Sequence, residues 1–176
     1  MIVPKTERLL LRQFTVDDAQ FILTLLNEPS FLRYIGDKKV RNLEDAAAYI
    51  LNGPVASYER NGFGLYLVEL KGSHTPIGMC GLLKRDELSD ADIGFAFLPA
   101  YWNKGLAFEA ATAVLQDARE RLSLQRILAI TSLDNEASIK LLQRLGFRFE
   151  EIMKLSPNGE QLRFFTKEVL PRMNAD

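Results

Sequence analysis

The sequence predicts one domain of the α/β class, in which a mixed sheet carries helices on both faces. The chain has 176 residues, which suffices for one hydrophobic core and is short for two domains. Its composition, 47% hydrophobic and 26% charged residues, is that of a globular protein. Strand-like and helical patterns follow the order strand, two helices, three strands, helix, strand, helix, two strands. Residues 1–176 are therefore expected to form a single domain, with its core at about residues 7–169.

The first strand and the first helix are marked by an apolar run followed by a capping pattern. Residues 7–14 form a short apolar run between charges and suit a strand. Thr15 follows, with Asp18 three residues later, a spacing typical of a capping box at the start of a helix. Glu28 and Pro29 close this helix. Its buried face is expected to consist of Phe21, Ile22, Leu25 and Leu26.

A second helix and three strands fill the middle of the chain. Asn42, with Asp45 three residues later, predicts a helix that Gly53 and Pro54 interrupt and that can resume to Tyr58. The following runs are rich in strand-forming residues, and the loops between them are short enough for antiparallel neighbours. These runs are residues 63–70, 76–84 and 90–98.

The C-terminal part alternates helices and strands and ends in a hairpin. Apolar residues at helical spacing predict a helix over about residues 104–122, and a buried-type strand follows at 126–133. The next helix spans about 135–145, and Gly146 is well placed to end it in a left-handed conformation. Ser156-Pro157-Asn158-Gly159 is a turn signal between strands at 147–155 and 160–169.

Charge and cysteine content argue against several classes of partner. The formal net charge is -1, and no basic run is long enough to follow a phosphate backbone, so we expect no nucleic acid. The single cysteine, Cys80, lacks the partners that a disulfide or a zinc site would require, so we expect no metal. The N-terminus lacks the apolar run of a signal peptide, and no run of about 18 apolar residues occurs. These features predict a cytoplasmic protein that does not bind membranes.

Residues 101–107 are the most informative stretch, because they join a predicted strand to a predicted helix. Gly105 and the small Ala107 would let an anion approach the backbone amides, the helix N-terminus adds positive partial charge, and Lys104 adds a full charge. A pyrophosphate would fit there. The alternative is a tight turn with a solvated lysine.

The combination of this turn with three further motifs resembles the GNAT superfamily of N-acetyltransferases, and most closely its RimJ/RimL-like branch, named for N-terminal acetylation of ribosomal proteins. The resemblance covers residues 6–169 and implies a GNAT-type fold with a largely antiparallel sheet of about seven strands. One departure is Trp102, which fills the position where the superfamily has Gln or Arg and which is usual in this branch. The further motifs are Ile93-Gly94-Phe95, Asn135-Glu136-Ala137-Ser138-Ile139-Lys140-Leu141-Leu142 and Leu145-Gly146-Phe147.

The resemblance implies that acetyl-CoA is the co-substrate and indicates where it binds. Its pantetheine arm would bond backbone groups near Phe97 and Leu98, and Asn135 would contact the same arm. The phosphates would lie on backbone amides, which need no particular side chain, so Trp102 does not disturb them. The residues that supply these amides are Asn103, Lys104, Gly105, Leu106 and Ala107.

The strand before the turn has two different faces. Ile93, Phe95 and Phe97 form a core face, whereas Asp92, Gly94 and Ala96 form a nearly bare face with room for a ligand, unless a helix packs over it. The resemblance implies that Asp92 acts, directly or through water, as the base for the incoming amine. Because an aspartate of ordinary pKa, about 3.9, is a weak base, we expect desolvation or a water relay. The alternative is that Asp92 is not a base and is bonded to a neighbouring loop.

Asn135 and Ser138 begin the predicted helix at 135–145, where both residue types are common caps. Three residues apart in one turn, their side chains can face the same side. By the resemblance, Ser138 is the candidate general acid that protonates the departing CoA thiolate.

The prediction is therefore an enzyme that transfers acetyl directly from acetyl-CoA to a primary amine. The resemblance favours a protein N-terminus as the amine acceptor, and an α-amino group, with a pKa of about 7.7–8.0, is easier to deprotonate than lysine. A polyamine, an aminoglycoside or another small amine is the alternative, and Asp37, Glu44, Asp45 and Glu59 could supply an acidic cleft for it. A non-catalytic acyl-CoA sensor is the alternative from another class. Either a monomer or a homodimer fits the sequence.

Overall fold

The computed structural model describes residues 5–169, which form a seven-stranded sheet in the order β1-β2-β3-β4-β5-β7-β6. All neighbouring strands are antiparallel except β4 and β5. The strands are β1 (Leu9–Gln13), β2 (Leu65–Leu70), β3 (Pro76–Leu83), β4 (Asp92–Phe97), β5 (Arg126–Ser132), β6 (Arg148–Met153) and β7 (Leu162–Glu168). The helices are α1 (Ala19–Leu26), α2 (Pro29–Tyr34), α3 (Leu43–Ile50), α4 (Ala56–Asn61), α5 (Leu106–Glu120) and α6 (Glu136–Arg144), with short turns η1 (Val16–Asp18), η2 (Leu51–Val55) and η3 (Pro99–Tyr101).

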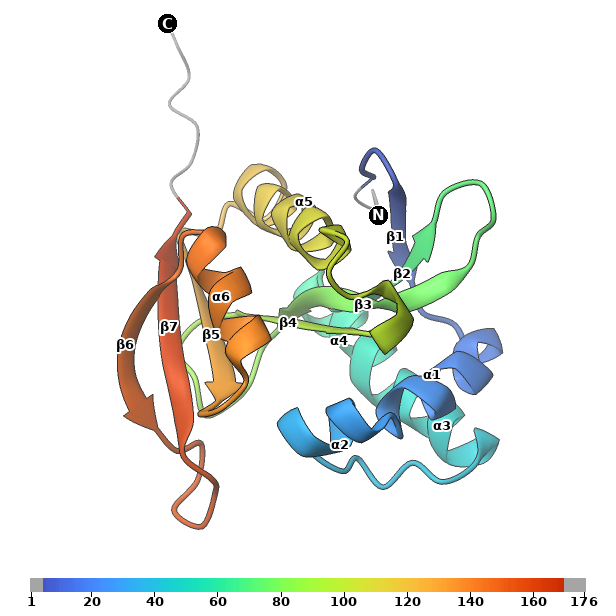
Figure 1. The fold of residues 1–176 in the computed structure, drawn as a ribbon, viewed down its shortest axis with the longest axis horizontal. Helices are drawn as coiled ribbons and strands as arrows, with labels where there is room; N and C mark the ends of the chain where they lie inside the picture. The colour runs from blue at the N-terminus through green and yellow to red at the C-terminus, as the bar shows by residue number, and fades with distance from the viewer. Residues whose placement is uncertain (1–4, 170–176) are drawn as a thin grey trace, which may run out of the picture.

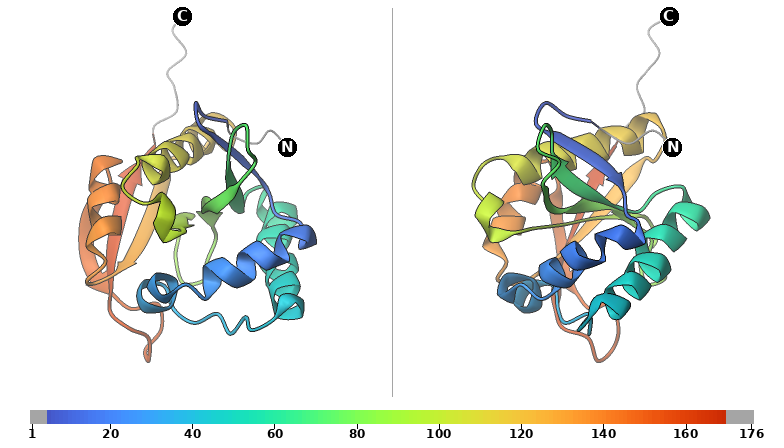
Figure 2. Two further views of the ribbon diagram at one scale, coloured as in Figure 1. Left: turned by 45° about the vertical axis from the view of Figure 1, so that its right-hand side comes forward. Right: turned by 90° about the vertical axis from the view of Figure 1, so that its right-hand side faces the viewer.

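Helices cover both faces of the sheet, as the sequence predicts. Figures 1 and 2 show α5 lying across one face and α1 with α3 across the other, while α6 covers β5. Two apolar clusters fill the two interfaces. One includes Ala110 and Val114 of α5 and Leu142 of α6, and the other includes Ile22 of α1 and Ile50 of α3. The predicted α/β architecture is confirmed.

The predicted caps are formed, but two helical segments differ from expectation. The Thr15 hydroxyl and the Asp18 carboxylate make the capping box, which starts the one-turn η1 before α1. Asn42 caps α3 by accepting the Asp45 amide at 2.8 Å. Pro29 ends α1 as predicted, yet it also begins α2, because proline suits the first helical position. Gly53 and Pro54 do not break the second helix but widen it into the π-turn η2, which leads into α4.

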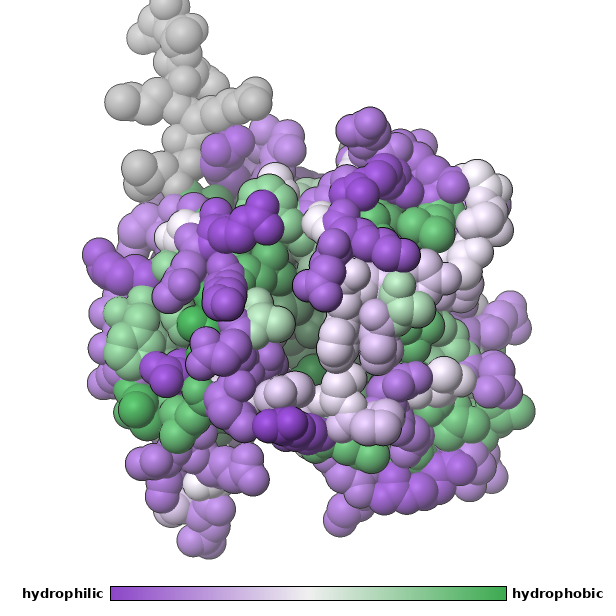
Figure 3. All heavy atoms as spheres, in the orientation of Figure 1, coloured by the Kyte–Doolittle hydropathy of each residue, from purple (hydrophilic) through white to green (hydrophobic). Residues whose placement is uncertain are grey.

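The parallel pair β4 and β5 diverges along its length. The two strands share a single register position, Asp92 opposite Leu128, whereas β4 pairs with β3 from Asp92 to Phe97. Figure 3, in the orientation of Figure 1, shows a hollow in the middle of the molecular surface. It lies between the part that carries α6 and β6 and the part that carries α1 and α2. Among residues 5–169, the divergence leaves the β5-facing backbone edge of β4 without a strand partner beyond its start.

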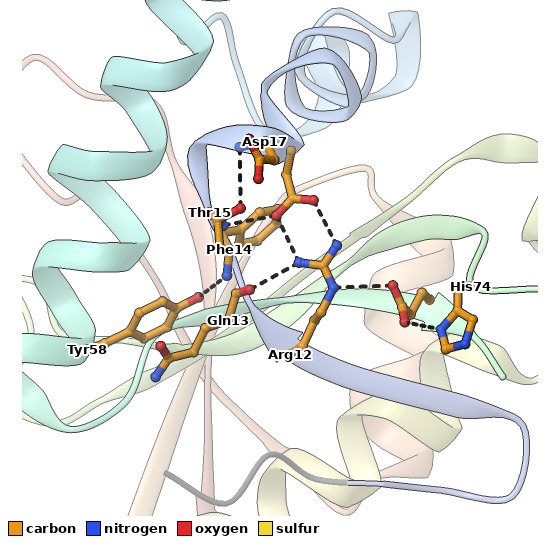
Figure 4. Close-up of polar contacts among 9 residues, drawn as sticks. Arg12, Gln13, Phe14, Thr15, Asp17, Tyr58 and His74 are labelled. Atoms are coloured by element: carbon orange, nitrogen blue, oxygen red, sulfur yellow. Dashed lines mark hydrogen bonds and ion pairs between the residues drawn. The ribbon is translucent and has the colours of Figure 1, made fainter.

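Arg12 on β1 joins the sheet to the helical layer (Figure 4). Its two Nη atoms donate to the two carboxylate oxygens of Asp18, at 2.9 and 2.8 Å, and its Nε donates to Glu69 at 3.2 Å. Both carboxylates are buried, and Glu69 also bonds His74 Nδ1 at 2.8 Å. A single guanidinium therefore compensates two buried negative charges.

Replacing Arg12 by alanine should lower the free energy of unfolding by about 3 kcal/mol, because it leaves buried carboxylates without their cation. Urea denaturation measures this loss. Arg148→Ala is the matched control, since the Arg148–Glu150 pair lies on the surface and should contribute less than about 0.5 kcal/mol. Equal losses in the two variants would show that the Arg12 network has no special stabilising role.

Candidate active site

The predicted anion-binding turn precedes α5. Asn103 and Gly105 both have positive φ, 61° and 76°, in the left-handed region that asparagine and glycine tolerate best. Gly105 is the N-cap of α5, and the first helical bond runs from the Glu109 amide to the Gly105 carbonyl at 3.1 Å. The amides of Leu106 and Ala107 lie in the first turn, where the helix itself offers no acceptor. The turn therefore presents several amides and the positive end of a helix at one place.

Three cations surround this turn, and sequence reasoning identified one of them. The Lys104 Nζ lies 5.7 Å from the centre of the Tyr101 ring, and the Arg144 guanidinium lies 4.5 Å from that of Phe108. Arg8 of the N-terminal segment donates to the Lys104 carbonyl at 3.0 Å. Glu109 accepts from the Arg8 Nε at 2.8 Å, which offsets the Arg8 charge and ties this segment to α5. Lys104, Arg144 and the helix end supply the remaining positive potential.

Hydrogen bonds within the protein already engage most of the backbone groups of Phe97 and Leu98 at the end of β4. Trp102 Nε1 donates to the Phe97 carbonyl at 2.8 Å, so the indole that departs from the superfamily pattern closes the loop before the turn. The Leu98 amide donates to the Ile77 carbonyl at 2.9 Å, and the Leu98 carbonyl accepts the Tyr101 amide at 2.9 Å. The Leu98 amide and carbonyl are therefore both engaged within the protein. By the alternation of an antiparallel pair, the Phe97 amide faces the open β5 side.

Asp92 begins β4 at the point where β4 and β5 diverge. Its side chain is 1% exposed, and Arg85 Nε donates to both carboxylate oxygens at 3.2 Å. Arg85 lies in the β3–β4 loop, so the alternative that Asp92 is bonded to a neighbouring loop describes this contact. Burial nevertheless raises the pKa of Asp92 to about 6, although Arg85 acts against this shift. The desolvation that a base requires is present.

The face of β4 that carries Asp92 is less bare than predicted. A Cβ added at Gly94 would lie 2.7 Å from Leu83 Cδ1 and 3.5 Å from Leu65 Cδ2. Leucine side chains of the neighbouring strands, and not a helix, therefore occupy the space above Gly94. Ala96 packs against the same apolar cluster. The expected room for a ligand along this face is wrong at Gly94, because an alternation pattern within one strand does not reveal what adjacent strands contribute.

Asn135 and Ser138 come together at the start of α6. Asn135 Oδ1 accepts the Ser138 amide at 3.3 Å, so Asn135 caps the helix, and Ser138 is half-buried. Two hydroxyls at the end of β5, those of Thr131 and Ser132, are buried without a hydrogen-bond partner within residues 5–169. A buried hydroxyl without a partner costs about 1–3 kcal/mol, so these two groups are unusual features of the strand end next to α6. Sequence reasoning missed them because serine and threonine are ordinary strand residues.

Comparison with known proteins decides the family. Residues 8–148 match the family model of the acetyltransferase (GNAT) domain. The chain belongs to this family. It is also 31% identical, over 85% of both chains, to the uncharacterized N-acetyltransferase YoaA of Bacillus subtilis. This GNAT protein is accordingly an acetyl-CoA-dependent N-acetyltransferase, and the alternative of a non-catalytic sensor is set aside.

Solved GNAT structures share its fold. The ribosomal-protein-S5-alanine acetyltransferase of Vibrio fischeri has a TM-score of 0.78 and 22% identity, covering 96% of this chain and 97% of that chain. RimL, a ribosomal L7/L12 alpha-N-protein acetyltransferase in complex with coenzyme A, has a TM-score of 0.79 and 15% identity, covering 95% and 98%. At these identities the likeness establishes the fold.

The structure also bears on Cys80, on metal binding and on membrane-spanning helices. Cys80 is buried, and burial raises the pKa of its thiol, so a thiolate nucleophile is disfavoured. In the described part of the chain, no group of three or more His, Cys, Asp or Glu side chains is arranged to hold a metal ion. Among residues 5–169, no helix is both long enough and apolar enough to span a membrane.

Proposed function

We propose that this GNAT protein acetylates the α-amino group of a protein or peptide N-terminus, as the RimJ/RimL-like branch does. The observation that carries the proposal is the buried Asp92 carboxylate with a pKa of about 6 at the divergence of β4 and β5. A base with that pKa is well matched to an α-amino group, whose pKa is about 7.7–8.0, and poorly matched to lysine at about 10.4. The ribosomal-protein substrates of the two structural neighbours support the same class of acceptor.

In the proposed reaction the amine nitrogen attacks the acetyl carbonyl carbon, the carbon–sulfur bond breaks, and the acetyl group remains on nitrogen. Asp92 takes the proton that the amine loses, directly or through a water molecule. The Phe97 amide polarises the carbonyl oxygen, which carries negative charge in the transition state. Ser138 gives its proton to the departing thiolate and recovers one from solvent. No covalent acyl-enzyme forms.

The amides of residues 103–107 hold the acetyl-CoA phosphates in this proposal, and Asn135 with the backbone near Phe97 and Leu98 holds the pantetheine arm. Within residues 5–169 no strand pairs with the β5-facing edge of β4 beyond its start, which leaves the Phe97 amide to bond the arm, whereas Trp102 already occupies the Phe97 carbonyl. The Asn135 carbonyl oxygen caps α6, so its amide group is the part left to meet the arm.

The test is acetylation of matched peptides after acetyl-CoA binding has been established by calorimetry. One peptide has a free N-terminus, and its twin has a blocked N-terminus and an internal lysine; a polyamine and an aminoglycoside complete the panel. We expect CoA release with the free peptide and none above background with the others. Faster turnover of the blocked peptide, the polyamine or the aminoglycoside would contradict an N-terminal acceptor.

A further inference from the structure

A group of cationic and polar side chains lies beside Asp92 and is not used by the chemistry proposed above. Arg85 contacts Asp92 through Nε, and neither of its Nη atoms has a hydrogen-bond partner among the described residues. Burial lowers the pKa of Lys38, and the nearby Arg85 charge lowers it further. Burial raises the pKa of Tyr49, and Arg85 acts in the opposite direction. Arg85 is therefore within electrostatic reach of both side chains.

Lys38 and Tyr49 line one hollow of about 410 Å³, between the segment before α3 and α3 itself. Lys38 is exposed as a residue, and partial burial of its ammonium lowers its pKa. Lys39 lines the same hollow. Of the two lysines that line the hollow, Lys38 lies within electrostatic reach of Arg85, the residue that contacts the proposed base.

The hollow is lined by two lysines, Lys38 and Lys39, and by one carboxylate, Asp45, so positive charge is in excess. Asp37 pairs with Arg41, and Asp45 Oδ2 accepts the Arg41 amide at 3.0 Å. Within residues 5–169, neither Lys38 nor Lys39 lies within 4.0 Å of a carboxylate oxygen. Because Arg41 pairs with Asp37 and two lysines outnumber Asp45, the hollow is not the acidic cleft that a polyamine or an aminoglycoside would require.

We propose that Arg85 and Lys38 form an anion subsite for the acceptor beside this hollow, and that the preferred acceptor is a peptide N-terminus followed closely by an acidic side chain. The Arg85 Nη groups and the Lys38 ammonium bind the acceptor carboxylate, while the α-amino group lies toward Asp92. An Arg fork binds a carboxylate through two parallel hydrogen bonds, which also fixes its orientation. This subsite rests on the proposed N-terminal acetylation and specifies its substrate class.

The experiment compares three peptides that differ only at the second residue, which is Asp, Asn or Lys. We expect kcat/KM to be at least about 10-fold higher for the Asp peptide than for the Asn peptide, and lowest for the Lys peptide. In Lys38→Glu the preference should disappear or reverse. Arg60→Glu, which makes the same charge change at an exposed site on α4, should keep the wild-type preference.

The outcomes separate this inference from the function on which it rests. Equal kcat/KM for all three peptides in the wild type would overturn the anion subsite and leave N-terminal acetylation intact. An acidic preference that persists in Lys38→Glu would overturn the assignment to Arg85 and Lys38. Failure to acetylate any peptide despite acetyl-CoA binding would overturn both. Unchanged acetyl-CoA affinity in the variants is the check that they are folded.

Discussion

Asp92→Asn should lower kcat/KM for acetyl transfer by about 100- to 10,000-fold while leaving the affinity for acetyl-CoA unchanged. The asparagine keeps the size of the side chain but cannot accept the proton of the attacking amine. Steady-state CoA release measures the rate, and calorimetry measures the affinity. Ser138→Ala should reduce the rate less, because water can protonate the thiolate.

The pH dependence of this reaction distinguishes a base from a structural ion pair. With a pKa of about 6, Asp92 is protonated at lower pH and cannot act as a base, so wild-type kcat/KM should fall as the pH drops through about 6. The residual activity of Asp92→Asn should lack this additional fall near pH 6 and keep only the decline caused by protonation of the acceptor amine. Asp90→Asn is the control, since Asp90 stands two residues away and forms an exposed pair with Arg126. A wild-type profile with the same shape as that of Asp92→Asn would exclude Asp92 as the base.

The free energy of unfolding provides a second test of the Asp92→Asn variant. Because folding raises the pKa of Asp92, the protonated form is favoured in the folded state, and the stability associated with this group is lost as the pH rises from about 4 to about 6. At pH 7 the neutral asparagine should therefore raise the free energy of unfolding, by up to about 3 kcal/mol. A purely structural aspartate would give the opposite sign.

Gly105→Val should weaken acetyl-CoA binding by about 100-fold or more. The φ of +76° at Gly105 is rarely adopted by a residue with a side chain, and it is a severe outlier for a β-branched residue. The turn would have to leave its left-handed conformation, which redirects the amides that are proposed to hold the phosphates. Calorimetric titration with acetyl-CoA measures the loss.

Gly62→Val is a close control for backbone strain. Gly62 has a φ of +75° at the C-cap of α4, and a Cβ there would meet nothing within 4 Å. Both variants should lose comparable stability, yet only Gly105→Val should lose acetyl-CoA affinity. An equal loss of affinity in the two would mean that general destabilisation, and not the phosphate turn, is responsible.

The sequence by itself determined the features that depend on local chemistry. The capping box of Thr15 and Asp18, the cap of Asn42 and the left-handed Gly146 each follow from residue types within a few positions of one another. The element order and the turn before α5 are predictable for the same reason. Pro29 shows the limit, because proline both ends one helix and begins the next, and only packing selects the second outcome.

Only the tertiary structure decided what depends on residues that are distant in the chain. It placed Leu83 over Gly94, engaged the Leu98 amide with Ile77, and brought Arg8 to the turn before α5. It also set the pKa of Asp92, because burial and the distance to Arg85 arise from the assembled loops and sheet. Charge excess around Lys38 likewise depends on which acids are paired elsewhere. These are long-range contacts, whose energies no local pattern encodes.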